Sequence, residues 1–225
     1  MKNNQELQRD VQDAIKWEPL LNAAEIGVTV KDGVVTLTGT VDSYSKKNEA
    51  EDATKNVKGV KAVVEKIEVQ FSGSHEKKND NEIANEIVNA IKWNWQVPND
   101  KVKVKVENGW ITLEGELEYN YQKEAAKNAV RNLLGVIGVS NNITIKSTKE
   151  EKVEKEAIQS ALRRNWSIDD NNIDVKVSGH NATLTGTVDS WYQKDEAERI
   201  AFNAPGVWSV DNELMVDFNY ALIDD

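Results

Sequence analysis

Hydrophobic and polar residues change their spacing in the same order three times along the chain. Each time, apolar residues three and four positions apart come first, which predicts a helix with one buried face. Two alternating stretches follow, which predict strands with one buried face, and then come a second helical segment and a last strand. The apolar positions expected for the first helices are Leu7, Val11, Ala14 and Ile15, then Ile83, Ile87, Ala90 and Ile91, and then Ala157, Ile158, Ala161 and Leu162.

These three units are copies of one sequence repeat. Residues 30–47, 106–123 and 177–194 align without gaps, at offsets of 76 and 71 residues. A chain of 225 residues has room for several compact cores. We therefore assign repeat 1 to 1–70, repeat 2 to 82–146 and repeat 3 to 153–218, with linkers at 71–81 and 147–152 and a C-terminal tail at 219–225.

Short turns join the first two strands of each repeat. Asp32-Gly33 and Asn108-Gly109 are typical of two-residue hairpin turns with both residues at positive φ. Gly179-His180 occupies the same place in repeat 3 and favours the type II′ turn instead. Counting outward from the first turn places the apolar residues of both strands on one face, in the pairs Val30 with Val35, Val28 with Leu37 and Ile26 with Gly39.

The order of the elements predicts the fold class. The second strand, second helix and third strand form a crossover unit, which favours a mixed three-stranded sheet in the order 1-2-3. We expect an α+β protein of three tandem αββαβ repeats, with both helices on one face of each sheet. The opposite face carries Thr36, Thr38 and Thr40 in repeat 1 and is expected to face solvent. Trp110 is the exception on that face and is a candidate for a contact between repeats.

Glycines occupy two equivalent places in every repeat. Gly39, Gly115 and Gly186 fall on the core side of the second strand, opposite a second helix whose buried stripe is mostly alanine. We expect these glycines to be buried and to let the helix backbone pack close to the sheet. A second set is expected to end the second helices as C-caps, and it consists of Gly59, Gly135 and Gly206.

Composition and charge exclude several functions. The absence of cysteine rules out disulfides and thiolate metal sites, and the net charge of −10 without a basic run argues against nucleic-acid partners. Residues 149–225 hold most of this charge, with 8 basic and 16 acidic side chains. No long apolar stretch is present, so we expect a cytoplasmic protein as written, or a periplasmic one if a signal peptide has been removed.

The sequence offers little chemistry for catalysis. His75 lies in a linker and His180 in a hairpin turn, and both are expected to be exposed surface residues. Residues 169–174 alternate acidic and amide side chains as in a calcium loop, but Val175 and Asn181 stand where the glycine and glutamate of that loop belong. We expect no catalytic residue, no metal and no cofactor.

Aromatic residues gather at the two points where helices and strands meet. Chain tracing places the end of the first helix and the start of the second helix at the same end of each repeat, which we call its aromatic end. Two interpretations stay open: the rings close a small core or dock one repeat on the next, or they form an exposed amphipathic surface. The residues are Trp17, Trp93, Trp95 and Trp166 after the first helices, and Tyr44, Tyr119, Tyr121, Trp191 and Tyr192 at the second.

The repeat resembles the BON domain family. The resemblance rests on the phrase hydrophobic-x-Leu-x-Gly-x-hydrophobic at 35–41, 111–117 and 182–188, followed by Gly-Val at 59–60, 135–136 and 206–207. It implies a bacterial, noncatalytic module that binds phospholipid or hydrophobic surfaces. OsmY-like members of the family are associated with osmotic and envelope stress and with protein protection.

Two functional hypotheses follow. The first is a stress-associated, chaperone-like binding module whose partners are a phospholipid membrane surface or unfolded protein. The second is a structural scaffold that assembles with itself or with a partner protein through its repeats, with the oligomeric state left open. The net charge of repeat 2 is less negative than that of repeat 3, which favours repeat 2 for contact with an anionic surface. The binding residues we expect are Trp93, Trp95, Tyr121, Lys92 and Lys123, with Trp17 and Tyr44 in repeat 1.

Overall fold

The computed structural model describes residues 3–71, 78–146, 152–168 and 172–217. His75, most of both predicted linkers, half of the calcium-like stretch and the whole predicted tail lie outside these residues.

Each repeat has the predicted order of helix, strand, strand, helix, strand. Repeat 1 comprises α1 (Asn4–Trp17), β1 (Ile26–Lys31), β2 (Val34–Val41), α2 (Tyr44–Lys55) and β3 (Ala62–Val69). Repeat 2 comprises α3 (Asp80–Trp93), β4 (Val102–Glu107), β5 (Trp110–Leu117), α4 (Asn120–Val130) and β6 (Gly138–Ile145). Repeat 3 comprises α5 (Lys155–Arg164), β7 (Ile173–Ser178), β8 (Asn181–Val188), α6 (Trp191–Phe202) and β9 (Ser209–Val216).

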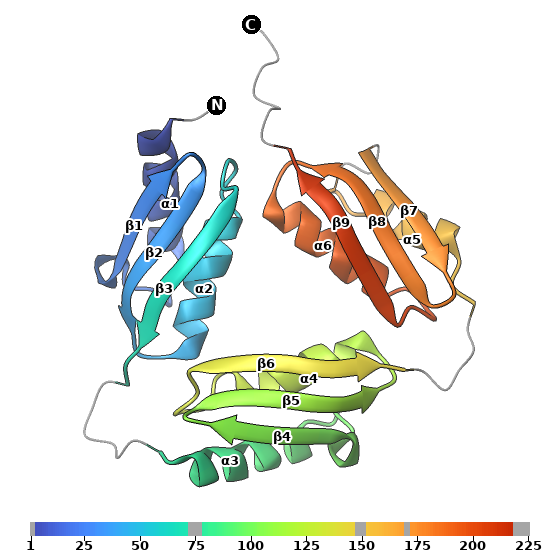
Figure 1. The fold of residues 1–225 in the computed structure, drawn as a ribbon, viewed down its shortest axis with the longest axis horizontal. Coiled ribbons are helices and arrows are strands. Elements are labelled where there is room, and N and C mark those ends of the chain that lie inside the picture. Colours follow the sequence, from blue (N-terminus) through green and yellow to red (C-terminus); the bar gives the residue numbers. More distant parts are fainter. Residues whose placement is uncertain (1–2, 72–77, 147–151, 169–171, 218–225) are drawn as a thin grey trace, which may run out of the picture. The chain divides into compact units, whose positions relative to one another are not determined.

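Each repeat forms its own mixed sheet with the second strand in the centre. The strand orders are β1-β2-β3, β4-β5-β6 and β7-β8-β9. The first pair of each sheet is antiparallel, and β5 with β6 and β8 with β9 run parallel. In repeat 1, Lys61 N donates to Gly33 O and Gln70 N to Val41 O, so β3 also runs parallel to β2. Both helices of each repeat lie on one face of its sheet, which confirms the predicted fold class (Figure 1).

The hairpin register is the one predicted from the turn residues. Ile26 lies opposite Gly39, Val28 opposite Leu37 and Val30 opposite Val35. The turn residues have φ values of 52° and 83° at Asp32 and Gly33, as a type I′ turn requires. In repeat 3 only the first turn residue, Gly179, has a positive φ, of 60°, which fits the predicted type II′ turn.

The core of each repeat lies between the sheet and its two helices. Helix positions spaced by four residues are buried, and their side chains pack on the inward-facing residues of the central strand. Asn3 and Asn79 begin α1 and α3 with capping boxes, in which the asparagine and a glutamate three residues later satisfy each other's backbone N–H groups. The buried residues include Leu7, Val11 and Ile15, then Ile83, Ile87 and Ile91, and then Ile158 and Leu162.

The prediction for Gly39, Gly115 and Gly186 was wrong in its physical reason. These glycines lie on the inner face but are only half-buried, and the atoms nearest to a Cβ added at each belong to the backbone at the start of the first strand, not to the second helix. A Cβ atom at Gly115 would stand 2.1 Å from the carbonyl oxygen of Lys101, the residue before β4, and φ there is +147°. Glycine is therefore required because the backbone of the neighbouring strand approaches closely and the φ value excludes other residues.

The glycines after the second helices are not C-caps. The helices α2, α4 and α6 end four or five residues earlier, at Lys55, Val130 and Phe202. The positive-φ glycine occupies the third position of a β-turn closed by the backbone bonds Val60 N to Val57 O, Val136 N to Leu133 O and Val207 N to Ala204 O. This geometry is a type II turn, which requires glycine at that position, and it leads directly into the third strand.

Trp110 packs on its own sheet. Its ring lies over Gly138 of β6. A Cβ atom added at Gly138 would stand only 2.4 Å from the nearest indole carbons, so a larger residue has no room there. Its Nε1 donates to Ser140 Oγ at 3.0 Å. The structure thus gives Trp110 a packing role within repeat 2, and the contact between repeats stays a prediction.

Candidate functional site

Four tryptophans near the ends of the first helices are almost fully exposed. Their exposed fractions are 84% for Trp17, 85% for Trp93, 89% for Trp95 and 95% for Trp166. Folded proteins rarely leave so much of a large aromatic side chain in water without a functional reason. These four rings do not close the core of their own repeat, so the interpretation of them as core plugs is wrong.

A local turn explains why two of these tryptophans point outward. The Asn94 side chain follows α3 and accepts a hydrogen bond from Gln96 N at 3.0 Å, which forms an Asx turn. Trp95 occupies the middle of this turn, while Val97 beyond it is buried and anchors the loop to the core. The turn recurs in repeat 3 with Asn165, Trp166, Ser167 and Ile168.

The starts of the second helices supply the other aromatic side chains. Tyr119 and Tyr121 stack with their ring centroids 5.6 Å apart and their planes 19° from parallel. Tyr121 and its counterpart Tyr192 are exposed, whereas Tyr44 in repeat 1 is half-buried. In repeat 3 the Lys194 ammonium lies 5.5 Å from the centroid of Trp191, within the range of a cation–π contact.

Repeat 2 places its five predicted binding residues at one end. In Figure 1, α3 ends and α4 begins at the same end of the sheet, where the arrow of β5 also ends. Lys92 in the last turn of α3 is exposed, and Lys123 near the start of α4 is half-buried. Trp93 and Trp95 belong to the α3 side of this end, and Tyr121 belongs to the α4 side, where its stacking partner is Tyr119.

Gln122 holds the start of α4, and sequence reasoning missed it. Its Oε1 accepts hydrogen bonds from Glu118 N at 3.1 Å and from Tyr119 N at 3.2 Å, and the side chain is buried. These bonds satisfy two backbone donors ahead of the helix and thereby position the tyrosine pair. Gln193 stands at the same place in the third copy, so the shared Tyr-Gln-Lys triplet at 121–123 and 192–194 was the available signal.

The described residues offer no obvious site for metal chemistry. Within them, no three histidine, aspartate or glutamate side chains come close enough together to hold an ion. His180 is half-buried, not exposed as predicted: its ring stacks on Trp208 at a centroid distance of 3.7 Å and an interplanar angle of 3°. Its Nδ1 lies 2.7 Å from Gly206 O.

Across the described ranges, no helix is long and apolar enough to cross a membrane.

Comparison with known proteins assigns the repeats to a family. The family model of the BON domain matches residues 3–70, 79–147 and 153–217, one match for each sheet with its two helices. This chain belongs to the BON domain family. The BON assignment confirms the resemblance inferred from the repeated glycine and valine positions.

One curated relative and one solved structure are similar to the BON chain over long stretches. Osmotically-inducible protein Y of Escherichia coli (strain K12) is 31% identical over 121 residues, which is 50% of this chain and 60% of that protein's length. A structure of the C-terminal domain of CdsD, the structural protein of the type III secretion system of Chlamydia trachomatis, covers 96% of this chain and is itself covered completely, at 17% identity and a TM-score of 0.25. A TM-score this low supports no inference about fold or function.

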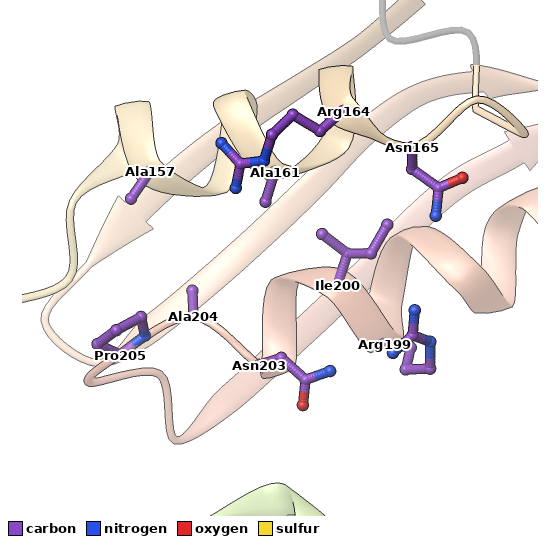
Figure 2. Close-up of a pocket in the computed structure, with 9 residues that line it drawn as sticks. All are labelled: Ala157, Ala161, Arg164, Asn165, Arg199, Ile200, Asn203, Ala204 and Pro205. Carbon is purple, nitrogen blue, oxygen red and sulfur yellow. The ribbon is translucent and has the colours of Figure 1, made fainter.

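The third BON repeat has a groove between its two helices. The groove has a volume of about 430 Å³ (Figure 2). Its apolar floor consists of side chains from both helices and the following turn: Ala157, Ala161, Ile200 and Ala204. Arg164 ends α5 and Asn165 follows it, Arg199 belongs to the second half of α6, and Pro205 belongs to the turn after α6.

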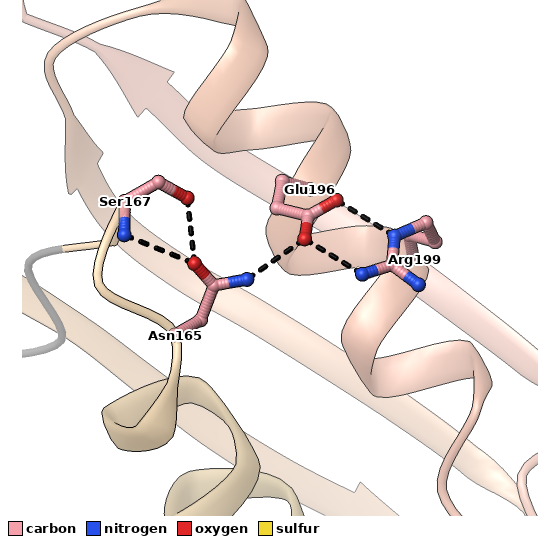
Figure 3. A network of polar contacts seen from close by, with 4 residues as sticks. All are labelled: Asn165, Ser167, Glu196 and Arg199. Atoms are coloured by element: carbon pink, nitrogen blue, oxygen red, sulfur yellow. Dashed lines mark hydrogen bonds and ion pairs between the residues drawn. The ribbon is translucent and has the colours of Figure 1, made fainter.

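A polar network joins the two helices beside this groove (Figure 3). Asn165 Oδ1 accepts bonds from the Ser167 backbone and hydroxyl, and Asn165 Nδ2 donates to Glu196 Oε1 at 2.8 Å. Arg199 donates to both oxygens of Glu196 through Nε and Nη2, each at 2.7 Å. These bonds from Arg199 hold the pKa of Glu196 below its ordinary value against the opposing effect of burial, so the carboxylate stays ionised at neutral pH.

Proposed function

We propose that this chain is a noncatalytic, stress-associated bacterial module that attaches to anionic phospholipid surfaces through the aromatic ends of its BON repeats. The observation that carries the proposal is the near-complete exposure of tryptophans at the same end of every repeat. Tryptophan is favoured at the boundary between water and lipid because its ring is apolar and its N–H remains able to bond water or headgroups. The association with stress rests on the similarity to a relative named as osmotically inducible.

Repeat 2 is the strongest candidate for the contact. It carries two exposed tryptophans, and Lys92 and Lys123 stand at the same end of the domain. Each basic residue near an anionic leaflet contributes about 1 kcal/mol of attraction, which salt screens. Repeat 3 exposes Trp166, but residues 149–225 carry twice as many acidic as basic side chains and oppose the approach of an anionic surface.

Unfolded protein and a partner in a scaffold are the competing occupants of the same surface. Exposed tryptophans would also contact apolar segments of an unfolded chain, or a second folded protein. The lysines at this end of repeat 2 favour the lipid surface, because their positive charge attracts anionic headgroups and does not attract apolar segments. A dependence of binding on anionic lipid and on salt therefore separates the lipid surface from the two protein partners.

Cosedimentation with vesicles tests the proposal. The Trp93→Ala/Trp95→Ala variant is expected to lose binding to phosphatidylglycerol vesicles and to keep the circular dichroism of the parent, because both rings project into solvent. Trp166→Ala removes an equally exposed ring from the acidic repeat and is the matched control, expected to bind nearly as well as the parent. Binding of the parent should weaken as salt is added and should be absent on phosphatidylcholine.

Either of two results would contradict the proposal. The first is that the double variant sediments with anionic vesicles as well as the parent does. The second is that the parent ignores vesicles at low salt and instead suppresses aggregation of an unfolded protein, which would assign the surface to the chaperone-like function.

A further inference from the structure

The hairpin turn of repeat 2 contains a side chain that can react with its own backbone. Asn108-Gly109 is the only Asn-Gly pair in the chain, and Asp32-Gly33 occupies the same place in repeat 1. Asparagine is a thermolabile residue, and a following glycine has no side chain that would hinder attack by its nitrogen on the asparagine amide. Asn108 is exposed, so water reaches it.

A carboxylate binds the backbone of this turn. Asp80, the first residue of α3, accepts a hydrogen bond from Asn108 N at 2.7 Å through Oδ2 and one from Gly109 N at 2.9 Å through Oδ1. Hydrogen bonds to an ionised group are about twice as strong as neutral ones. Asp80 therefore holds Gly109 N, the atom that would attack the side chain, against the start of the helix.

The turn of repeat 1 is built in the same way but lacks the second bond. Asn4 occupies the place of Asp80, and its Oδ1 accepts from Asp32 N at 2.9 Å. Gly33 N has no hydrogen-bond partner among the described residues. In both turns the glycine carbonyl accepts one bond from the backbone of the residue before the third strand. The two turns therefore differ in whether a carboxylate binds the glycine N–H.

This contact gives Asp80 control over a chemical modification. We propose that Asn108 is a deamidation site that Asp80 protects while repeat 2 is folded. In the reaction, Gly109 N loses its proton and forms a bond to Asn108 Cγ, the Cγ–Nδ2 bond breaks, and the side-chain amide takes up that proton and leaves as ammonia. Water then opens the cyclic imide at one of its two carbonyls, which gives aspartate or isoaspartate at position 108.

The folded turn prevents this attack in two ways. The φ values of 52° at Asn108 and 81° at Gly109 are those of a type I′ turn. The ψ of the first turn residue is then about +30°, which places the Gly109 nitrogen nearly opposite the Asn108 Cβ across the Cα–C bond. Removal of the proton from Gly109 N would also put a second negative charge beside the Asp80 carboxylate. The reaction therefore requires the turn to open, and the bonds to Asp80 make opening rarer.

Either product changes repeat 2. An aspartate at position 108 adds negative charge to the residue whose N–H binds Asp80. Isoaspartate lengthens the backbone of a two-residue turn by one carbon, which disturbs the pairing of β4 with β5 beyond it. Each opening of the turn thus carries a chance of permanent damage to the hairpin, and Asp80 lowers that chance.

Peptide mass spectrometry of the full chain after long, warm incubation at mildly alkaline pH tests the proposal. Asp80→Ala is expected to deamidate at Asn108 about tenfold faster than the parent, because the turn opens more often without the two bonds. Asp100→Ala removes the same charge at the other end of β4 and is expected to deamidate as slowly as the parent. Amide spectra recorded before incubation show whether both variants are folded.

A transfer of the same geometry to repeat 1 tests the proposal without a change in repeat 2. Asp32→Asn puts an Asn-Gly pair into the turn whose glycine N–H is unbound, so position 32 is expected to deamidate faster than Asn108 in the same molecule. Adding Asn4→Asp supplies a carboxylate at the place of Asp80 and is expected to slow the reaction at position 32. The proposal is overturned if Asp80→Ala deamidates no faster than Asp100→Ala, if position 32 is as stable as Asn108, or if Asn4→Asp leaves the rate at position 32 unchanged.

Discussion

At the scale of the residue, one position in each repeat requires glycine, because it combines a positive φ with a close contact to a backbone carbonyl. Gly186 combines a φ of +123° with a virtual Cβ atom 1.9 Å from Asn172 O. Gly179 in the same repeat also has a positive φ, of +60°, but no atom lies within 4 Å of its virtual Cβ. The two glycines therefore separate the cost of the backbone angle from the cost of the close approach.

We expect Gly186→Ala to destabilise repeat 3 by about 3 kcal/mol or more, because the strand must move as well as adopt a strained φ. Gly179→Ala is expected to cost only about 1 kcal/mol, from the left-handed angle alone. Hydrogen exchange of the β8 amides measures both values within one repeat. Equal costs for the two variants would show that the contact with the Asn172 carbonyl is unimportant.

The ion pair of Glu196 gives repeat 3 a pH dependence with a definite sign. The pKa of Glu196 is lowered in the folded state, so its contribution to stability is present above the unfolded pKa of about 4.3 and disappears as the pH falls through the lower folded value. We expect Glu196→Gln to cost about 0.5 kcal/mol at neutral pH and nothing at about pH 2. Hydrogen exchange in α6 across this range measures the difference, and a cost that persists unchanged in acid would contradict the assignment.

Sequence reasoning reached some of these residues and missed others for physical reasons. The hairpin register followed from Asp32-Gly33, because a two-residue turn determines every pair beyond it. The reason for Gly115 was missed because a one-letter pattern contains neither φ nor the position of the Lys101 carbonyl. The exposure of Trp95 was left open because an amphipathic ring is equally compatible with a core edge and with a surface.

At the scale of the element, the start of the second helix shows how one side chain organises a local structure. Gln122 acts only as an acceptor, for two backbone N–H groups, in the hydrogen bonds among described residues. Gln193 in repeat 3 accepts from Asp189 N at 2.8 Å and also donates its Nε2 to Ser167 O at 2.9 Å. The same residue type thus has an additional role in repeat 3, where it connects α6 to the loop after α5.

This difference predicts that the same substitution has different effects in the two repeats. Gln122→Glu keeps the acceptor and adds negative charge at a helix N-terminus, so repeat 2 is expected to change in stability by less than about 0.5 kcal/mol. Gln193→Glu replaces a donor with an oxygen that faces the Ser167 carbonyl, and repeat 3 is expected to lose about 1 to 3 kcal/mol. Hydrogen exchange in α4 and α6 compares the two, and an equal loss in both would argue against the bond to Ser167.

At the scale of the whole molecule, three copies of one fold have acquired different surfaces. Repeat 2 has exposed tryptophans with lysines at the same end, whereas repeat 3 has an excess of acidic residues and a groove between its two helices. The common core residues keep the αββαβ fold in each copy, while positions such as 93 and 164 vary without affecting it. Repetition of a stable domain therefore allows separate binding surfaces within one chain.

Quenching of tryptophan fluorescence by acrylamide, with and without phosphatidylglycerol vesicles, tests the central claim most directly. Four of the seven tryptophans are almost fully exposed, so quenching of the free protein is expected to be strong. Vesicles should reduce it at low salt in the parent, and this reduction should largely disappear in the Trp93→Ala/Trp95→Ala variant. Weak quenching of the free protein, or strong quenching that vesicles leave unchanged, would contradict the account.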